Sequence, residues 1–243
     1  MKKLICFDLD GTLTQHRTKL DKKNKEFLDD LIRSGYRVIM VGAGTCERIY
    51  QQIDNYPLDI VANYGMQESK VIDGEFKIVK EITSNPDKEY FIEKIAYIRQ
   101  KYGYTDYKGD GVEFHKTGMV TVPMLGTEAD IKDKLAFDPT REKRQVIYPE
   151  LLQLFSDYSV YIGGSSSFDF TEKQYNKYEA TMNYARENGF TKEEVLFVGD
   201  DFGDGGGDSH VRIYGMDYVS IDDYKMVKEK VEEFLANYEA KNK

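Results

Sequence analysis

The feature that most constrains the fold is a short apolar run that ends in two closely spaced acids. Leu4–Phe7 is uninterrupted and apolar, and Asp8-Leu9-Asp10-Gly11-Thr12 follows it directly. A short apolar run bounded by polar turn residues is typical of a buried parallel strand that leads into a loop. We therefore predict a central strand at residues 4–7, with both acids at its carboxyl end.

Strands and helices alternate in the first and last parts of the chain. The helix after Asp21 has its apolar positions at Phe27, Leu28, Leu31 and Ile32, and Gly35 ends it. Further strands are predicted at 37–41, 59–62, 194–198 and 217–221, and further helices near 46, at 176–188 and at 222–242. Such alternation indicates a parallel α/β sheet.

The middle of the chain has a different pattern. A hairpin with its turn at Asp73-Gly74 precedes it. Helices near 85–101, 128–136 and 141–155 and strands near 112–125, 160–162 and 168–170 follow. This mixture predicts an α+β unit inserted into the α/β domain. We expect an α/β fold with a doubly wound parallel-sheet core at 1–83 and 173–243 and the inserted α+β unit at 84–172.

Composition narrows the class of partner and the compartment. The net charge is −9, which argues against a nucleic-acid partner. No segment approaches the roughly 20 apolar residues of a membrane span, so no membrane partner is expected. Cys6 and Cys46 are expected to be reduced, buried thiols, and the expected location is cytoplasmic. The sequence leaves the oligomeric state open.

Ligands of open α/β sheets collect at the carboxyl ends of the parallel strands. Chemistry-bearing groups are expected there at four places: Asp8 with Asp10, the turn Gly42–Thr45, Lys177, and the segment Asp200–Asp208. Two acids as close as Asp8 and Asp10 do not both stay charged easily without a cation between them. Oxygen-only ligands suit Mg²⁺, so we predict a magnesium site.

The segment from Phe7 to Thr14, Phe-Asp-Leu-Asp-Gly-Thr-Leu-Thr, resembles motif I of the haloacid dehalogenase (HAD) superfamily. The resemblance implies that Asp8 is the nucleophile that forms an aspartyl-phosphate and that Asp10 is the general acid/base. It also implies that Mg²⁺ is held by Asp8, the backbone carbonyl of Asp10, and Asp200. The dehalogenases of the superfamily act without the second Asp, so Asp10 favours phosphorus chemistry.

Three further segments fit the order of that superfamily's motifs. Gly44 or Thr45 stands where a phosphate-binding group is kept, although a plain strand-to-helix turn is an equal alternative. Lys177 matches the lysine that offsets charge on the phosphoryl group; the alternative is a solvated surface lysine. The segment from Gly199 to Asp208 resembles motif IV, in which Asp208 is a supporting acid or a further metal ligand through water. The alternative is a glycine-rich surface loop.

A closer resemblance, over most of the chain, is to the eukaryotic-type phosphomannomutases, which carry a C2-type cap. This resemblance implies that the α+β unit at 84–172 is a cap that selects the substrate. Arg17 stands at that family's position seven residues after Asp10, and the segment Gly163–Asp169 is similar to one that binds sugar hydroxyls, here through Ser167 and Asp169. The family's three phosphate-binding cap arginines are not matched. Their positions hold His115, Thr127 and Lys134, with Lys116, Lys132, Arg141 and Arg144 nearby as candidate substitutes.

A mutase must grip the second phosphate of its substrate, and lysine replaces a bidentate arginine poorly. The sequence therefore favours a phosphatase that acts on a phosphorylated sugar or a similar small metabolite. The alternative is phosphomannomutase-like interconversion of hexose 1-phosphate and hexose 6-phosphate. A remote alternative, a non-catalytic sugar- or metal-binding module, is disfavoured because no key residue is missing.

Overall fold

The computed structural model describes residues 1–241, which form two compact units. The first unit comprises residues 1–81, 176–204 and 208–241. The second comprises Ile82–Tyr175 together with Gly205–Gly207. The sequence placed the divisions at 83/84 and 172/173 and gave no sign that Gly205–Gly207 belong to the second unit. They do so through the backbone, because the Ile162 N–H donates to the Gly205 carbonyl at 2.8 Å.

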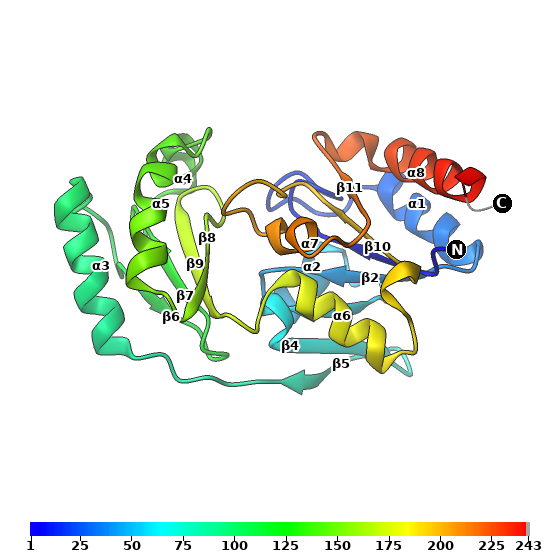
Figure 1. Ribbon diagram of the computed structural model, residues 1–243, viewed down its shortest axis with the longest axis horizontal. Helices are drawn as coiled ribbons and strands as arrows, with labels where there is room; N and C mark the ends of the chain where they lie inside the picture. Colours follow the sequence, from blue (N-terminus) through cyan, green and yellow to red (C-terminus); the bar gives the residue numbers. More distant parts are fainter. Residues whose placement is uncertain (242–243) are drawn as a thin grey trace. The chain divides into compact units, whose positions relative to one another are not determined.

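The first unit is built on a seven-stranded sheet in the order β11-β10-β1-β2-β3-β4-β5 (Figure 1). Five strands run parallel: β1 (Leu4–Phe7), β2 (Arg37–Val41), β3 (Asp59–Ala62), β10 (Val195–Gly199) and β11 (Tyr218–Ser220). The expected hairpin forms the antiparallel edge as β4 (Gln67–Ile72) and β5 (Glu75–Glu81), and both strands are longer than expected. The predicted parallel sheet is confirmed.

Helices cover both faces of this sheet. On one face α1 (Lys22–Arg33), α2 (Cys46–Gln52) and α8 (Val227–Lys241) share a buried cluster with Ile5 and Phe7. On the other, α6 (Lys177–Glu187) and α7 (Ser209–Ile213) pack with Leu4 and Cys6. Successive side chains of a strand point to opposite faces, so the uniformly apolar β1 serves both layers. The core is therefore doubly wound, as predicted.

Local chemistry sets the helix ends, and it explains where the expectations differ. The Asp21 carboxylate accepts from the Asn24 N–H at 2.8 Å and caps α1, as expected, but Ile32 is 42% exposed rather than on the buried face. The last helix begins at Val227 instead of 222, because Asp223 caps a separate 3₁₀ turn, η3 (Tyr224–Met226). Helix α7 was not predicted, since five residues are too few to show helical periodicity.

The second unit contains a four-stranded antiparallel sheet in the order β6-β7-β9-β8. Its strands are β6 (Glu113–Phe114), β7 (Val120–Pro123), β8 (Tyr158–Tyr161) and β9 (Ser167–Glu172), and its helices are α3 (Lys88–Tyr102), α4 (Ile131–Phe137) and α5 (Glu142–Leu154). The single strand predicted at 112–125 is wrong. It is two short strands joined by a turn at Gly118, where φ is +91° and a Cβ would lie 2.1 Å from the Ser84 hydroxyl.

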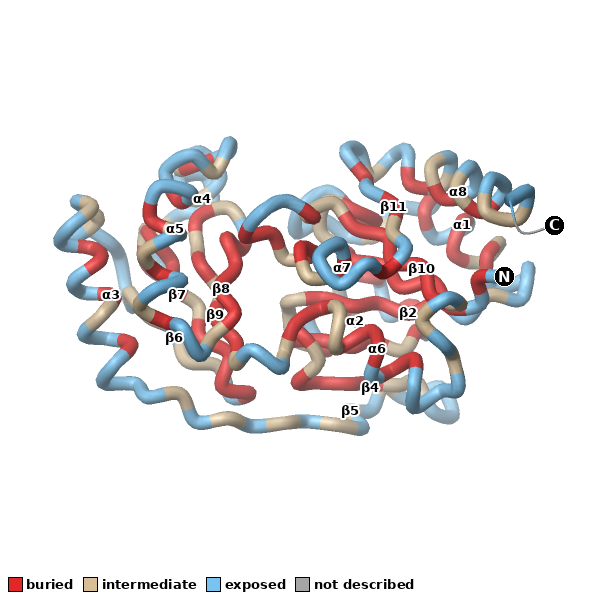
Figure 2. The backbone as a smooth tube through the Cα atoms, viewed as in Figure 1, coloured by how far each residue is buried: buried red, intermediate tan, exposed pale blue. Residues whose placement is uncertain are grey.

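Buried residues follow the parallel strands of the first unit and, separately, the sheet of the second (Figure 2). In the second unit Phe91 stacks on Phe155 with ring centroids 4.6 Å apart, and Phe170 packs edge-on against both. Cys6 and Cys46 are buried and free. Across residues 1–241, no helix is both long and apolar enough to cross a membrane.

Candidate active site

Three carboxylates meet at the carboxyl edge of the parallel sheet. Asp8 follows β1 and Asp200 follows β10, and these neighbouring strands pair in register, with Phe7 opposite Val198. Asp208 lies just before α7. One ligand atom of each acid lies within 4.8 Å of the others. The sequence thus named three acids, from distant parts of the chain, that the fold brings together.

Lys177 binds two of these acids from the first turn of α6. Its Nζ donates to Asp8 Oδ1 at 2.7 Å and to Asp208 Oδ1 at 2.6 Å. Asn176 caps this helix, and its side-chain oxygen accepts from the Glu179 N–H. Only 4% of Lys177 is exposed, so the alternative of a solvated surface lysine does not hold.

Burial and mutual repulsion raise the pKa of two of the carboxyls. Burial is the main cause for Asp8, whose pKa rises to about 6 although Lys177 opposes the rise. Burial and then the charge of Asp8 raise the pKa of Asp200 to about 8. For Lys177 burial acts to lower the pKa, but Asp208 and Asp8 outweigh it and raise the pKa. Three acids share one ammonium, so an additional cation would relieve the repulsion.

The donor set fits a hard divalent cation. All three acids offer carboxylate oxygen, which is the ligand type that Mg²⁺ prefers. Asp208 is fully buried, and its two oxygens already accept from Lys177 and from the Asp201 N–H, at 3.0 Å. Asp208 therefore orients Lys177 and the loop that carries Asp200, which fits the supporting role that the sequence left open.

Gly11 makes the close approach of Asp200 possible. Its φ is +92°, and a Cβ at this position would lie 2.3 Å from Asp200 Oδ2. The neighbouring Thr12 hydroxyl donates to Asp200 Oδ1 at 3.3 Å. Any side chain at residue 11 would strain the turn and displace the Asp200 carboxylate.

The Asp10 carboxylate lies in a separate hydrogen-bond network. Its Oδ1 accepts from the Arg17 N–H at 2.7 Å and from Gln52 Nε2 at 2.6 Å, and its Oδ2 accepts from Arg48 Nη2 at 3.0 Å. Burial would raise the pKa of Asp10, but Arg48, the Arg17 N–H and Gln52 outweigh it and lower the pKa. The contact from Arg17 comes from its backbone.

Sequence reasoning missed Arg48 and Gln52. They lie four residues apart on α2 and so share one face of the helix. Polar residues at this spacing normally indicate a solvated face. The signal that was available is their position, because α2 begins directly after the turn that ends β2, at the ligand edge of the sheet.

The turn after β2 has a clear structural role. The Thr45 hydroxyl accepts from the Arg48 N–H at 3.2 Å and caps α2. Arg48 also lies across Gly44, where a Cβ would be 2.4 Å from Arg48 Nε. The plain strand-to-helix turn that the sequence allowed is thus present, and it places a guanidinium over Gly44.

In the second unit the two predicted sugar-binding residues lie on one strand. Ser167 and Asp169 are two residues apart on β9 and share a face. The Ser167 hydroxyl donates to the Gly163 carbonyl at 3.1 Å. Asp169 Oδ1 accepts from the Thr121 hydroxyl at 2.8 Å, and His115 Nε2 lies 2.9 Å from the same hydroxyl oxygen. His115, Thr121 and Asp169 thus form one polar row.

Two basic residues, the nearby candidate Arg144 and Lys134 at one of the unmatched arginine positions, already bond to backbone carbonyls. Arg144 is buried and donates to the carbonyls of Gly163, Gly164 and Ser167 at 2.8–3.1 Å, so it is not free to bind a phosphate. Lys134 donates to the Thr127 carbonyl at 2.8 Å.

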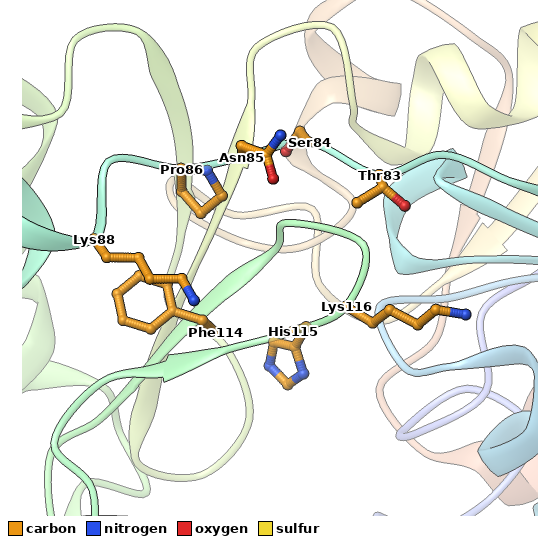
Figure 3. A pocket seen from close by; sticks show the side chains of 8 residues that line it. All are labelled: Thr83, Ser84, Asn85, Pro86, Lys88, Phe114, His115 and Lys116. Atoms are coloured by element: carbon orange, nitrogen blue, oxygen red, sulfur yellow. The ribbon is translucent and has the colours of Figure 1, made fainter.

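A pocket of about 350 Å³ lies between the extended segment 83–86 and the turn after β6 (Figure 3). Its basic lining residues are Lys88, His115 and Lys116. Lys88 Nζ lies 5.3 Å from the Phe114 ring centroid. The Lys116 side chain points away from Lys88 and Phe114 (Figure 3).

Comparisons with solved structures agree with this fold. The structure of an IMP-bound IMP-nucleotidase from Plasmodium falciparum aligns with a TM-score of 0.68 at 13% identity, covering 97% of this chain and 68% of that one. A sugar phosphatase of HAD subclass IIB aligns with a TM-score of 0.61 at 15% identity, covering 96% of this chain and 99% of that one. At these identities the likeness concerns the fold.

Comparisons of sequence identify relatives over most of the chain. A phosphomannomutase of Encephalitozoon cuniculi is 24% identical over 237 residues, covering 91% of this chain and 90% of that protein. A phosphomannomutase of Saccharomyces cerevisiae is 25% identical over 237 residues, with 90% of each covered. The model of the haloacid dehalogenase-like hydrolases matches residues 5–205, which include Asp8, Lys177 and Asp200. The chain therefore belongs to the haloacid dehalogenase-like hydrolase family.

Proposed function

We propose that this enzyme is a Mg²⁺-dependent phosphatase that hydrolyses a phosphorylated sugar or a similar small metabolite through an aspartyl-phosphate on Asp8. One observation carries the proposal. Asp8 is a buried carboxylate at the end of β1, bound by Lys177 and within 4.8 Å of Asp200, atom to atom. Family and relatives place the chain among phosphatases and phosphomutases, so it is an enzyme, and the non-catalytic alternative is set aside.

The chemistry follows in two steps. A carboxylate oxygen of Asp8 attacks phosphorus, the ester P–O bond breaks, and Asp10 gives its proton to the leaving oxygen. Asp10, now ionised, takes a proton from water as that water attacks the phosphorus. The bond between Asp8 and phosphorus then breaks and releases inorganic phosphate. Lys177 offsets the negative charge that Asp8 and the phosphoryl group share.

Asp8, Asp200 and the backbone carbonyl of Asp10 would hold the Mg²⁺. The bound ion would supply positive charge to a site in which three acids share one ammonium. Asp208 would support these ligands through its bonds to Lys177 and to the Asp201 N–H.

We infer that the first unit carries the catalysis and that the second selects the substrate, with Ser167 and Asp169 binding sugar hydroxyls. The surroundings of the cap residues support hydrolysis over mutase activity. At the positions of the family's phosphate-binding arginines, His115 contacts Thr121, Lys134 contacts the Thr127 carbonyl, and the nearby Arg144 is buried. A mutase needs a strong grip on a second phosphate, and arginine provides this best.

A phosphomannomutase-like mutase is the second candidate. It is favoured by the phosphomannomutases that match about nine-tenths of this chain at 24–25% identity. Lys88, His115 and Lys116, which line one pocket of the second unit, are the basic groups that such an activity could use.

The test follows mannose 1-phosphate and glucose 1-phosphate with Mg²⁺, with and without a hexose bisphosphate, and measures free phosphate and hexose 6-phosphate separately. We expect free phosphate as the main product, at a rate that the bisphosphate does not change. Hexose 6-phosphate that forms only with the bisphosphate would overturn the phosphatase and establish the mutase. If neither product forms, the substrate class is wrong.

A further inference from the structure

The Asp10 carboxylate already accepts three hydrogen bonds. Gln52 Nε2 and the Arg17 N–H both donate to Oδ1, and Arg48 Nη2 donates to Oδ2. An acid that exchanges a proton with a substrate needs one oxygen directed at that substrate. The three contacts occupy three of the roughly four acceptor sites of the carboxylate, and Oδ2 accepts from Arg48 alone, so loss of the Arg48 contact would open Oδ2 fully to a substrate.

Arg48 is the partner best placed to leave. The Arg48 side chain is 43% exposed and that of Asp10 is 20% exposed, and ion pairs in contact with water contribute little to stability. Gln52, in contrast, is also fixed by a contact to the Thr14 hydroxyl at 3.2 Å. The Arg17 contact comes from the backbone, so it can change only if the turn moves.

The same guanidinium lies where an anion is expected. It passes over Gly44, at the carboxyl end of β2, and β2 pairs directly with the strand that Asp8 follows. Around Asp8, three carboxylates face the ammonium of Lys177, and even with a bound Mg²⁺ a phosphoryl dianion would leave the site net negative, so a further cation would favour phosphate binding. The planar fork of arginine suits phosphate oxygens.

We propose that Arg48 is a phosphoryl-binding residue that changes partner when substrate binds, leaving Asp10 for the phosphate and so freeing the Asp10 carboxylate for proton transfer. The ligand class is a phosphate monoester, and the anion is its reacting phosphoryl group. The inference rests on the proposed function, since it takes the site around Asp8 as the place where phosphate binds.

Partner exchange has a thermodynamic consequence. If phosphate and Asp10 compete for one guanidinium, phosphate binding includes the cost of breaking the Arg48–Asp10 pair. Neutralising Asp10 removes that cost, but only while Arg48 is present. The effects of changing Asp10 and Arg48 on phosphate affinity should therefore be coupled, and a double-mutant cycle measures the coupling.

The experiment measures binding of inorganic phosphate by calorimetry at saturating Mg²⁺ to the wild-type protein and to Arg48→Met, Asp10→Asn and the double variant. We expect Arg48→Met to weaken phosphate binding by roughly tenfold, the scale of one lost charge-assisted contact. Asp10→Asn should tighten binding several-fold when Arg48 is present and clearly less when it is not.

Two further variants separate the general loss of an arginine charge from the loss of the guanidinium group at residue 48. Arg33→Met removes an exposed arginine that pairs with Asp30 on α1, and phosphate affinity should not change. Arg48→Lys keeps a positive charge without the fork and should recover only part of the affinity. Wild-type affinity in Arg48→Met, or equal tightening by Asp10→Asn with and without Arg48, would overturn the exchange.

Binding and turnover separate this inference from the proposed function. Calorimetry reports the exchange without any chemical step, so uncoupled Asp10 and Arg48 effects would leave hydrolysis at Asp8 intact. Full turnover by Asp8→Asn, in contrast, would remove the proposed mechanism whatever the cycle gives.

Discussion

Each unit contains a buried cation, and the two cations differ in the groups that they bond. In the first unit Lys177, 4% exposed, donates to two carboxylates, Asp8 and Asp208. In the second unit Arg144, 1% exposed, pairs with Asp138 but gives further bonds to the carbonyls of Gly163, Gly164 and Ser167. Both cations are buried, but their hydrogen-bond partners differ. The lysine compensates acids at a ligand edge, whereas the arginine fixes the turn that precedes β9.

Arg99 extends the pattern of the second unit. Its guanidinium donates to the carbonyls of Tyr104, Gly111, Pro123 and Met124. These four carbonyls belong to loops and strand ends of the second unit, so the bonds from Arg99 hold those segments in place. The partners of a buried cation, more than its type, therefore indicate whether it serves chemistry or architecture.

The largest effect is expected at Asp8. Asp8→Asn removes the proposed nucleophile, so kcat should fall by at least about a thousandfold. The fold should survive, because a neutral amide is easier to bury than a carboxylate whose pKa is already raised to about 6. Steady-state kinetics and thermal unfolding of the same preparation test both statements. Near wild-type turnover would contradict the role of Asp8.

Paired substitutions test the comparison of the two cations directly. Lys177→Met should lower kcat by about a hundredfold or more, because charge on Asp8 and the phosphoryl group is no longer offset. Arg144→Met should mainly lower stability, by roughly 3–5 kcal/mol, since it leaves Asp138 buried without its ion-pair partner. Kinetics and urea unfolding separate the two outcomes. A large kcat loss in Arg144→Met with unchanged stability would break the distinction.

Much of the first unit was predictable, because its signals are local. Leu4–Phe7 is apolar throughout and buried on both faces, and the cap at Asp21 is a short-range contact. The acids at the strand ends follow from the general rule for ligand sites in parallel sheets. These patterns placed Asp8, Asp200 and Asp208 at one edge before any distance was known.

The rest depends on contacts between residues far apart in sequence. Arg48 meets Asp10 across 38 positions; the place of α2 after β2 puts Arg48 near this edge of the sheet, but it does not indicate that Asp10 is its partner. Arg144 resembles a candidate for phosphate binding until its carbonyl partners, about 20 residues away, are known. The strand expected at 112–125 is interrupted because Gly118 packs against Ser84, a contact that periodicity does not encode.

A smaller effect is expected in the second unit. Asp169→Ala should raise KM for a sugar phosphate by roughly tenfold, the scale of a lost charged hydrogen bond, with little change in kcat. Asp157→Ala removes an exposed acid of the same unit and should leave both constants unchanged. Unchanged KM in Asp169→Ala would show that Asp169 has a structural role, as in its contact with Thr121, and does not bind the substrate.

The smallest effect concerns pH and metal, and it sharpens the comparison because two carboxyls of the first unit, Asp8 and Asp200, have raised pKa values. The pKa of Asp200 rises from an ordinary 3.8 to about 8, and that of Asp8 to about 6. A raised pKa favours the protonated form in the folded state. The metal-free protein therefore keeps this contribution to stability below about pH 4 and loses it as the pH rises through 6 and 8.

Mg²⁺ binds the ionised acids, so it should restore more stability at pH 8.5 than at pH 6. With Mg²⁺ about tenfold above its Kd at pH 8.5, we expect a rise in Tm on the order of 3–5 °C, shrinking toward pH 6. Thermal unfolding of wild type and Asp200→Asn across this range measures it, and the variant should show a flatter response. An equal Mg²⁺ shift at every pH would mean that these acids do not hold the ion.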